Sequence, residues 1–208
     1  VLILFSAKYY HRISTQDVNR IKFLFLPIAA LVAPVLLVIA QPDLGTSILI
    51  AIGGITVSWL AGVRVKFFAY AGILFLSLTP VAISFLKPYQ KSRILTFLNP
   101  DRDPLGAGYQ IIQSKIAIGS GGLFGKGFLN GSQSYLDYLP EKHTDFIYTL
   151  FSEEFGFFGS FFILSLYALI TYRIIRIGNL TRSNFGKLYC YGFATAFFIY
   201  VVVNMMMV

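Results

Sequence analysis

Long apolar stretches are the feature that most constrains this sequence. Five of them run for about 20 residues with few charged side chains, and none alternates apolar and polar residues as a barrel strand does. A chain inside lipid must satisfy its own backbone hydrogen bonds, which leaves helices or closed barrels. We therefore predict an all-α polytopic membrane protein, a bundle of transmembrane helices. The predicted spans are residues 21–40, 44–62, 67–86, 146–172 and 188–208, with the tail of a further span at 1–7.

The composition is typical of a membrane protein. Of the 208 residues only 12% are charged, against about a quarter in soluble domains, and the mean hydropathy is +0.71. We find no internal repeat and predict one transmembrane domain over residues 1–208. Val1 to Phe5 resemble no signal peptide, and the sequence stops at Val208 within an apolar run, so we expect a central fragment of a longer chain.

The charged residues divide between the two sides of the membrane. Because closely linked spans alternate in direction, the connecting segments form two sets. One set contains ten basic residues and a single acid, Asp17, for a net charge of +9, whereas the other contains seven basic and eight acidic residues, for a net charge of −1. The positive-inside rule places the first set in the cytoplasm and the large loop of residues 87–146 on the extracytoplasmic side of the membrane. The total charge of +8 thus reflects topology, and we expect no nucleic-acid partner.

The extracytoplasmic loop of residues 87–146 is polar and rich in Gly and Pro. Loops of this length between compact elements are usually functional. Residues 107–118 are compatible with a short helix that has one apolar side, typical of a helix at the membrane interface. We therefore expect the loop to carry short helices and the functional residues.

Residues 119–127, called the glycine loop below, resemble a phosphate-binding loop. The match fails because the motif needs Gly at Ser120 and Ser or Thr at Gly127, and no strand precedes the segment, which argues against an ATPase. Two interpretations stay open. The glycines could present backbone N–H groups to an anion beside Lys126, or they could simply permit tight turns. The spacing by itself favours the second interpretation.

Polar side chains gather where the loop enters the span of residues 146–172. A helix through this segment places Glu141 and Asp145 on one face, one turn apart, and Thr149 and Ser152 continue that face. A polar stripe is therefore predicted to descend from the loop into the span.

Other acidic residues allow more than one interpretation. Glu153 and Glu154 lie among phenylalanines, where ionisable groups are functional candidates or partners of a basic residue of the loop, and both interpretations are equally supported. Asp101 and Asp103 could hold a divalent cation such as Mg²⁺ or Mn²⁺, although a solvated turn explains them better. A metal site built on His143 and its acidic neighbours would need a non-helical turn.

Four motifs occur in a fixed order along the chain. They are QPDLGT at 41–46, DPLGAGYQ at 103–110, QSKIAIGSGG at 113–122 with GKG at 125–127, and QS at 133–134 followed by LPEKHTDFI at 139–147. Together they resemble the SEDS family of bacterial cell-wall polymerases, and are closer to its elongation members (RodA) than to its division members (FtsW). The resemblance covers nearly the whole chain.

This resemblance implies a truncated SEDS fold and a peptidoglycan glycosyltransferase of the bacterial inner membrane. Such an enzyme polymerises lipid II into glycan strands during cell elongation and needs no nucleotide. Its partners would be a class B penicillin-binding protein and other membrane proteins of the elongation complex. The family's essential acid falls at Asp145, which we expect to be the general base. Expected substrate-binding residues are Lys115 and Lys126 as clamps of the pyrophosphate, together with Gln113, Ser114, Glu141 and His143.

Two other functions stay open at this point. Acids within spans and the prolines of the span at 21–40, Pro27 and Pro34, would also suit a lipid II flippase. A non-catalytic scaffold of the cell-wall synthesis complex would need no catalytic acid.

Overall fold

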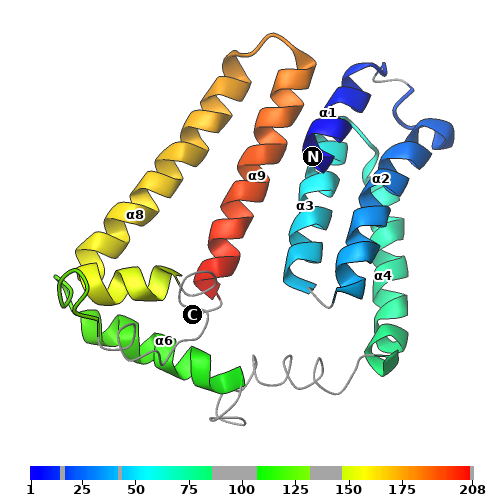
Figure 1. The fold of residues 1–208 in the computed structure, drawn as a ribbon. Coiled ribbons are helices and arrows are strands. Elements are labelled where there is room, and N and C mark those ends of the chain that lie inside the picture. The colour runs from blue at the N-terminus through cyan, green and yellow to red at the C-terminus, as the bar shows by residue number, and fades with distance from the viewer. Residues whose placement is uncertain (15–16, 42–43, 86–106, 132–146, 207–208) are drawn as a thin grey trace. The chain divides into compact units, whose positions relative to one another are not determined.

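The computed structural model describes residues 1–14, 17–41, 44–85, 107–131 and 147–206. Throughout these ranges the ordered elements are α-helices joined by turns, with no strand (Figure 1). The helices are α1 (Leu2–His11), α2 (Ile21–Ala40), α3 (Leu44–Leu60), α4 (Val65–Phe85), α6 (Ala107–Gly121), α8 (Ile147–Leu180) and α9 (Asn184–Met206). The predicted all-α class is confirmed.

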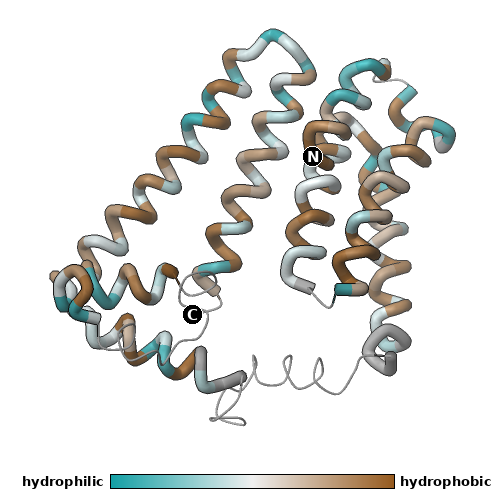
Figure 2. The backbone as a smooth tube through the Cα atoms, viewed as in Figure 1, coloured by the Kyte–Doolittle hydropathy of each residue, from teal (hydrophilic) through white to brown (hydrophobic). Residues whose placement is uncertain are grey.

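Several helices are long and apolar enough to cross a membrane. Among the described residues these are Lys22–Ala40, Ile147–Leu180 and Asn184–Met206, and α3 and α4 contain shorter apolar stretches. Figure 2 shows apolar residues along α2 and α4 and hydrophilic residues in the connection between α8 and α9. Apolar side chains such as Phe25, Leu37 and Phe75 point outward rather than into a core. The chain is therefore a polytopic helical membrane protein, whose outer surface suits lipid.

The observed helices lie close to the predicted spans. α2 covers residues 21–40 as predicted and contains both Pro27 and Pro34. α8 is the main difference, because it continues to Leu180 whereas the predicted span ends at residue 172. The helix at 107–118 is also present, and it extends as α6 to Gly121. Pro42 and Asp43 of the QPDLGT motif lie outside the described residues.

The chain divides into two compact units. The first contains Val1–Leu74 and Ala168–Tyr200, and the second contains Phe75–Tyr167 and Val201–Val208. The first holds most of the packed helices, and the second holds the glycine loop.

Close helix contacts in the first unit depend on small residues. A Cβ atom at Gly54 of α3 would lie 2.6 Å from Leu31 Cδ1 of α2, and one at Gly192 of α9 would overlap Val57 of α3. Lipid tails are as apolar as leucine, so helices in membranes associate through close packing rather than through a hydrophobic driving force. The glycines therefore leave the room that the side chains of Leu31 and Val57 occupy.

Hydrogen bonds and a ring contact gather three basic connections at one end of the first unit (Figure 1). Asn19, before α2, donates to the carbonyl oxygen of Gly62 (3.3 Å) and accepts from the N–H of Arg64 (2.8 Å), both in the connection between α3 and α4. The ring of His11 meets that of Phe185 at the start of α9, with centroids 6.4 Å apart. The segments that the charge pattern assigns to one side of the membrane thus lie together.

We expect Gly192→Ala to destabilise the first unit, because the new methyl group overlaps the branched side chain of Val57. Overpacking of this kind typically costs about 1–3 kcal/mol. The measurement is thermal unfolding of the full-length protein in detergent. Gly72→Ala in α4 is the matched control, since nothing lies within 4 Å of the added methyl group. Equal melting temperatures for the two variants would contradict this account of the packing.

Candidate functional site

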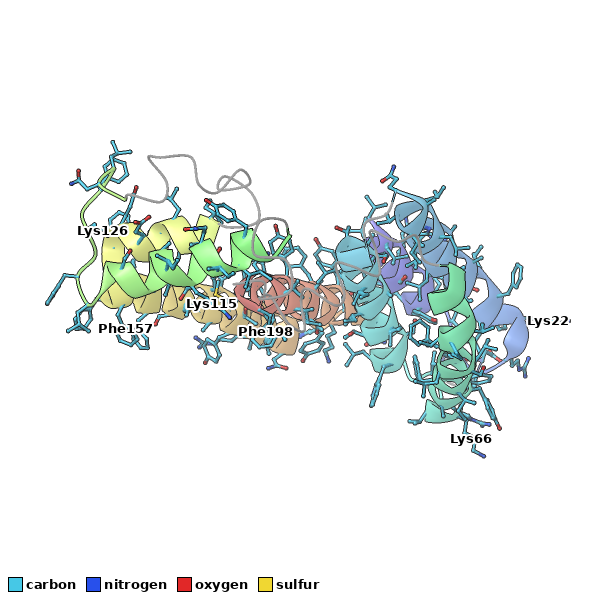
Figure 3. All side chains as sticks on the ribbon, turned by 90° about the horizontal axis from the view of Figure 1, so that it is seen from below. Lys22, Lys66, Lys115, Lys126, Phe157 and Phe198 are labelled. Atoms are coloured by element: carbon cyan, nitrogen blue, oxygen red, sulfur yellow. The ribbon has the colours of Figure 1, made fainter. Side chains whose placement is uncertain are left out.

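The second unit is organised around two helices that lie alongside each other. α6 runs beside the first part of α8 in both views (Figures 1 and 3). Gly121 of α6 faces the α8 backbone so closely that a Cβ atom there would overlap the carbonyl oxygen of Ser152. Only glycine at this position permits that approach.

α8 is interrupted at Gly156. This residue has φ 65° and ψ −161°, outside the helical region, and separates a first segment of residues 147–155 from a second that begins at Phe157. The span predicted at residues 146–172 is uninterrupted, so the prediction lacks this break. Its only signal is a glycine between Phe155 and Phe157 in an otherwise apolar run.

A broken helix leaves backbone groups unpaired at the break, and here the glycine loop pairs them. The N–H groups of Lys126 and Gly127 donate to the carbonyl oxygens of Glu153 and Glu154, each at 3.0 Å. In the opposite direction the N–H of Phe157 donates to the carbonyl oxygen of Gly122 at 2.9 Å. The loop therefore supplies partners to both ends of the interruption.

Positive backbone φ angles make this docking possible. Gly122, Gly125 and Gly127 have φ angles of 55°, 80° and 98°, in the left-handed region that favours glycine. A Cβ atom at Gly125 would also overlap the carbonyl oxygen of Glu154. The glycines are therefore required by the turn and by the close approach to α8.

An ion pair reinforces the same contact. Lys126 Nζ lies 2.7 Å from Glu153 Oε1, and the two side chains are 29% and 1% exposed. Lys126 thus contacts Glu153 through both its backbone N–H and its ammonium group. Figure 3 labels Lys126 on the glycine loop. A buried carboxylate is costly unless a cation and hydrogen bonds compensate it.

These contacts bear on the two interpretations of the glycine loop. The N–H groups of Gly125, Lys126 and Gly127 donate to the carbonyl oxygens of Gly121, Glu153 and Glu154 respectively. They are consequently engaged within the protein. The geometry favours the tight-turn interpretation over the anion site, and it favours ion pairing over a catalytic role for Glu153.

The interface between α6 and α8 is lined by small and polar side chains. Ser160 Oγ lies within hydrogen-bond distance, 2.8 Å, of both Ser152 Oγ and the carbonyl oxygen of Gly156. The hydroxyls of Ser114 on α6 and Thr149 on α8 are fully buried and have no hydrogen-bond partner among the residues that the structure describes. Buried hydroxyls normally find partners, so these two are exceptions among the described residues.

The predicted substrate-binding residues of α6 point in different directions. Ser114 is buried, Gln113 is half-buried and Lys115 is exposed. Successive helical residues are 100° apart, so these neighbours cannot all reach one ligand from the same side. Figure 3 places Lys115 on α6, away from Lys126 on the loop.

The remaining predicted residues cannot be placed. Glu141, His143 and Asp145 lie outside the described residues, as do Asp101 and Asp103. Within the described ranges, no group of three or more His, Cys, Asp or Glu side chains is arranged to hold a metal ion. Thr149 and Ser152, which continue the predicted polar stripe, are both buried.

Comparison with known proteins gives consistent matches. The family model FtsW/RodA/SpoVE, described as cell cycle protein, matches residues 1–208. Peptidoglycan glycosyltransferase MrdB of Escherichia coli K12 is 48% identical over 176 residues, which cover 84% of this chain and 48% of that protein. Stage V sporulation protein E of Bacillus subtilis is 37% identical over 204 residues, covering 98% of this chain and 55% of that protein.

Further relatives agree with these. A probable peptidoglycan glycosyltransferase FtsW of Buchnera aphidicola is 39% identical over 175 residues, covering 84% of this chain and 49% of that protein. A solved structure, described as "Structural coordination of polymerization and crosslinking by a peptidoglycan synthase complex", matches with a TM-score of 0.71 and 32% identity, covering 99% of this chain and 56% of that one. The chain spans about half the length of the curated relatives it matches.

We expect the Lys126–Glu153 pair to show strong coupling in a double-mutant cycle. Lys126→Met leaves the Glu153 carboxylate buried without its cation, and breaking a buried pair costs about 3–5 kcal/mol. Glu153→Gln should cost less, because Lys126 is partly exposed. In the double variant most of the loss should be recovered, since no buried charge remains.

The measurement is the free energy of unfolding of the full-length protein in detergent. Lys115→Met, at an exposed cation of the same unit, is the control and should change stability little. Strictly additive losses in the cycle would show that the two side chains do not stabilise each other.

Proposed function

Since the chain belongs to the FtsW/RodA/SpoVE family of cell cycle proteins, we propose that the full-length protein is a peptidoglycan glycosyltransferase. It polymerises lipid II into glycan strands for cell elongation and cell-shape maintenance. The observation that carries this proposal is the identity of 48% with a curated peptidoglycan glycosyltransferase over most of the chain. The four motifs quoted above support it independently.

In the proposed reaction, a sugar hydroxyl of one substrate attacks the anomeric carbon of another that is linked to a lipid pyrophosphate. A new glycosidic C–O bond forms, the bond from that carbon to the pyrophosphate oxygen breaks, and the hydroxyl proton passes to a base. We assign the base to Asp145, two residues before the start of α8 at Ile147. A carboxylate placed within hydrogen-bond reach of the hydroxyl can accept this proton.

Cations of the loop would stabilise the charge of the departing pyrophosphate. Lys115 suits this role, because its side chain is exposed on α6 and available to an anion. Gln113, Ser114, Glu141 and His143 are also proposed to contact the substrate. Ser114 is fully buried on a different side of α6 from Lys115, so its contact would require a change in the packing of α6.

Lys126 has a different role in this proposal. Its ammonium group is bound to Glu153. We therefore assign both residues to positioning the first segment of α8 rather than to binding the pyrophosphate. By holding the glycine loop against the break at Gly156, the pair fixes the position of the end of the first segment of α8. The backbone that carries Asp145 leads directly into that segment.

The proposed location is the bacterial inner membrane, with residues 87–146 facing outward. The support is the charge difference of +9 against −1 between the two sets of connections. The contacts that gather the basic connections at one end of the first unit agree with a common side. The proposed partners are a class B penicillin-binding protein and other membrane proteins of the elongation complex. Their support is the likeness to a chain of a peptidoglycan synthase complex.

One assay separates this function from the alternatives. The purified full-length protein is given lipid II, both in detergent and in liposomes. Glycan polymer is the expected product. Transfer of lipid II across the liposome bilayer without polymer would instead identify a flippase. The absence of both polymer and transfer would indicate a non-catalytic scaffold.

Asp145→Asn should lower the polymerisation rate by about 10²–10⁴-fold, the usual contribution of a general base. Asn keeps the shape of the side chain, so folding and partner binding should be retained. Asp137→Asn, in the same loop, is the matched control and should polymerise normally. Near-normal polymerisation by the full-length Asp145→Asn protein would refute the assignment and make Glu141 or Glu154 the candidate base.

Topology is tested by cysteine labelling in a variant of the full-length protein without native cysteines, which requires Cys190→Ser. A cysteine at position 133 should react with a membrane-impermeant reagent in intact spheroplasts, because residues 87–146 face outward. A cysteine at position 183, between α8 and α9, should react only after permeabilisation. The reverse pattern would overturn the proposed orientation.

A further inference from the structure

The glycine loop and the two residues that follow it carry a set of large apolar side chains that do not pack into the protein. Leu123, Phe124, Phe128 and Leu129, called the loop tip, are between 60% and 81% exposed. The segment of residues 123–129 contains a single charged residue, Lys126. Soluble surfaces rarely expose apolar side chains so densely, and such patches usually mark a binding surface for lipid or another protein.

The loop tip adjoins the outer surface of the second segment of α8. The ring of Phe124 lies 5.4 Å from that of Phe158, and Phe158 in turn contacts Phe157 at 6.1 Å, measured between centroids. Phe157, Phe158, Phe161 and Phe162 are all more than half exposed. These phenylalanines belong to a helix long and apolar enough to cross the membrane. One apolar surface thus continues from the span onto the loop.

The backbone at the centre of the same segment is hydrogen-bonded within the protein. The N–H groups of Gly125, Lys126 and Gly127 donate to carbonyl oxygens of the loop or of α8, and the carbonyl oxygen of Leu123 accepts from the N–H of Phe158. Irregular backbone is tolerated at membrane depth only where its hydrogen bonds are made internally. These groups at the centre of the segment meet that condition, and the segment as a whole lies at the boundary of the bilayer rather than in its core.

The charge of Lys126 is also compensated. Its ammonium group is paired with Glu153 at 2.7 Å, on the side of the loop that packs against α8. An unpaired cation would resist entry into hydrocarbon, whereas a paired one is far less costly. The loop therefore directs apolar side chains outward while its charge and its hydrogen bonds point inward.

We propose that the loop tip inserts into the boundary between headgroups and acyl chains of the lipid bilayer, beside α8. The occupant of this apolar surface is bulk membrane lipid, because the surface is continuous with that of a membrane-spanning helix. Phenylalanine and leucine are the side chains with which interfacial segments enter this zone. The inference does not depend on the catalytic activity.

The test uses the full-length protein without native cysteines, reconstituted in vesicles of phosphatidylethanolamine and phosphatidylglycerol that contain no isoprenoid lipid. Spin labels are attached to cysteines introduced by Phe124→Cys and, in a second variant, Phe128→Cys. Phe161→Cys on α8 is the lipid-facing reference, and Arg182→Cys between α8 and α9 is the aqueous reference. The measurement is the ratio of label accessibility to oxygen and to a water-soluble nickel complex.

Labels at positions 124 and 128 should give a ratio close to that at 161 and several-fold above that at 182. A ratio equal to that at 182 would place the loop tip in water and overturn the proposal. Low accessibility to both reagents would show that protein covers the tip, which also overturns it. Since isoprenoid lipid is absent, a lipid-like ratio cannot come from the hydrocarbon tail of a substrate. Elution as a single species in size-exclusion chromatography confirms that each labelled variant is folded.

Discussion

The interruption of α8 at Gly156 is the constraint on which the second unit depends. A helix that breaks inside a membrane protein exposes carbonyl and N–H groups that cost several kcal/mol each when left unpaired in hydrocarbon. The glycine loop supplies partners to both sides of this break, and glycines at positions 121, 125 and 156 allow the backbones to approach. The break in α8 and the glycine loop therefore stabilise each other.

The same requirement explains why the polar side chains of this unit point inward. Ser152 and Ser160 bond to each other, and Glu153 pairs with Lys126, while phenylalanines of α8 and of the loop face outward. In water the opposite distribution would be favoured, since burial of apolar surface drives folding. In lipid there is no such drive, and polar groups gain by meeting within the protein. The arrangement thus fits lipid surroundings better than aqueous ones.

The helices of the first unit pack together in a different way. Its helices approach through glycines such as Gly54 and Gly192 rather than through polar pairs. Polar contacts there are concentrated at one end, where Asn19 and His11 connect the basic segments.

The sequence by itself determined the helical class, the approximate positions of the spans and the family, because these follow from local composition, from hydropathy over about 20 residues and from motifs read in order. It also identified Lys126 and Glu153 as candidates, but it could not tell a catalytic role from ion pairing. Only the tertiary structure brought together these two residues, 27 positions apart, and revealed the break at Gly156. The physical reason is that a glycine in an apolar run is compatible with a continuous helix. The helix is interrupted where a second segment offers hydrogen bonds to the freed backbone groups, and that pairing is a property of the fold rather than of any local pattern.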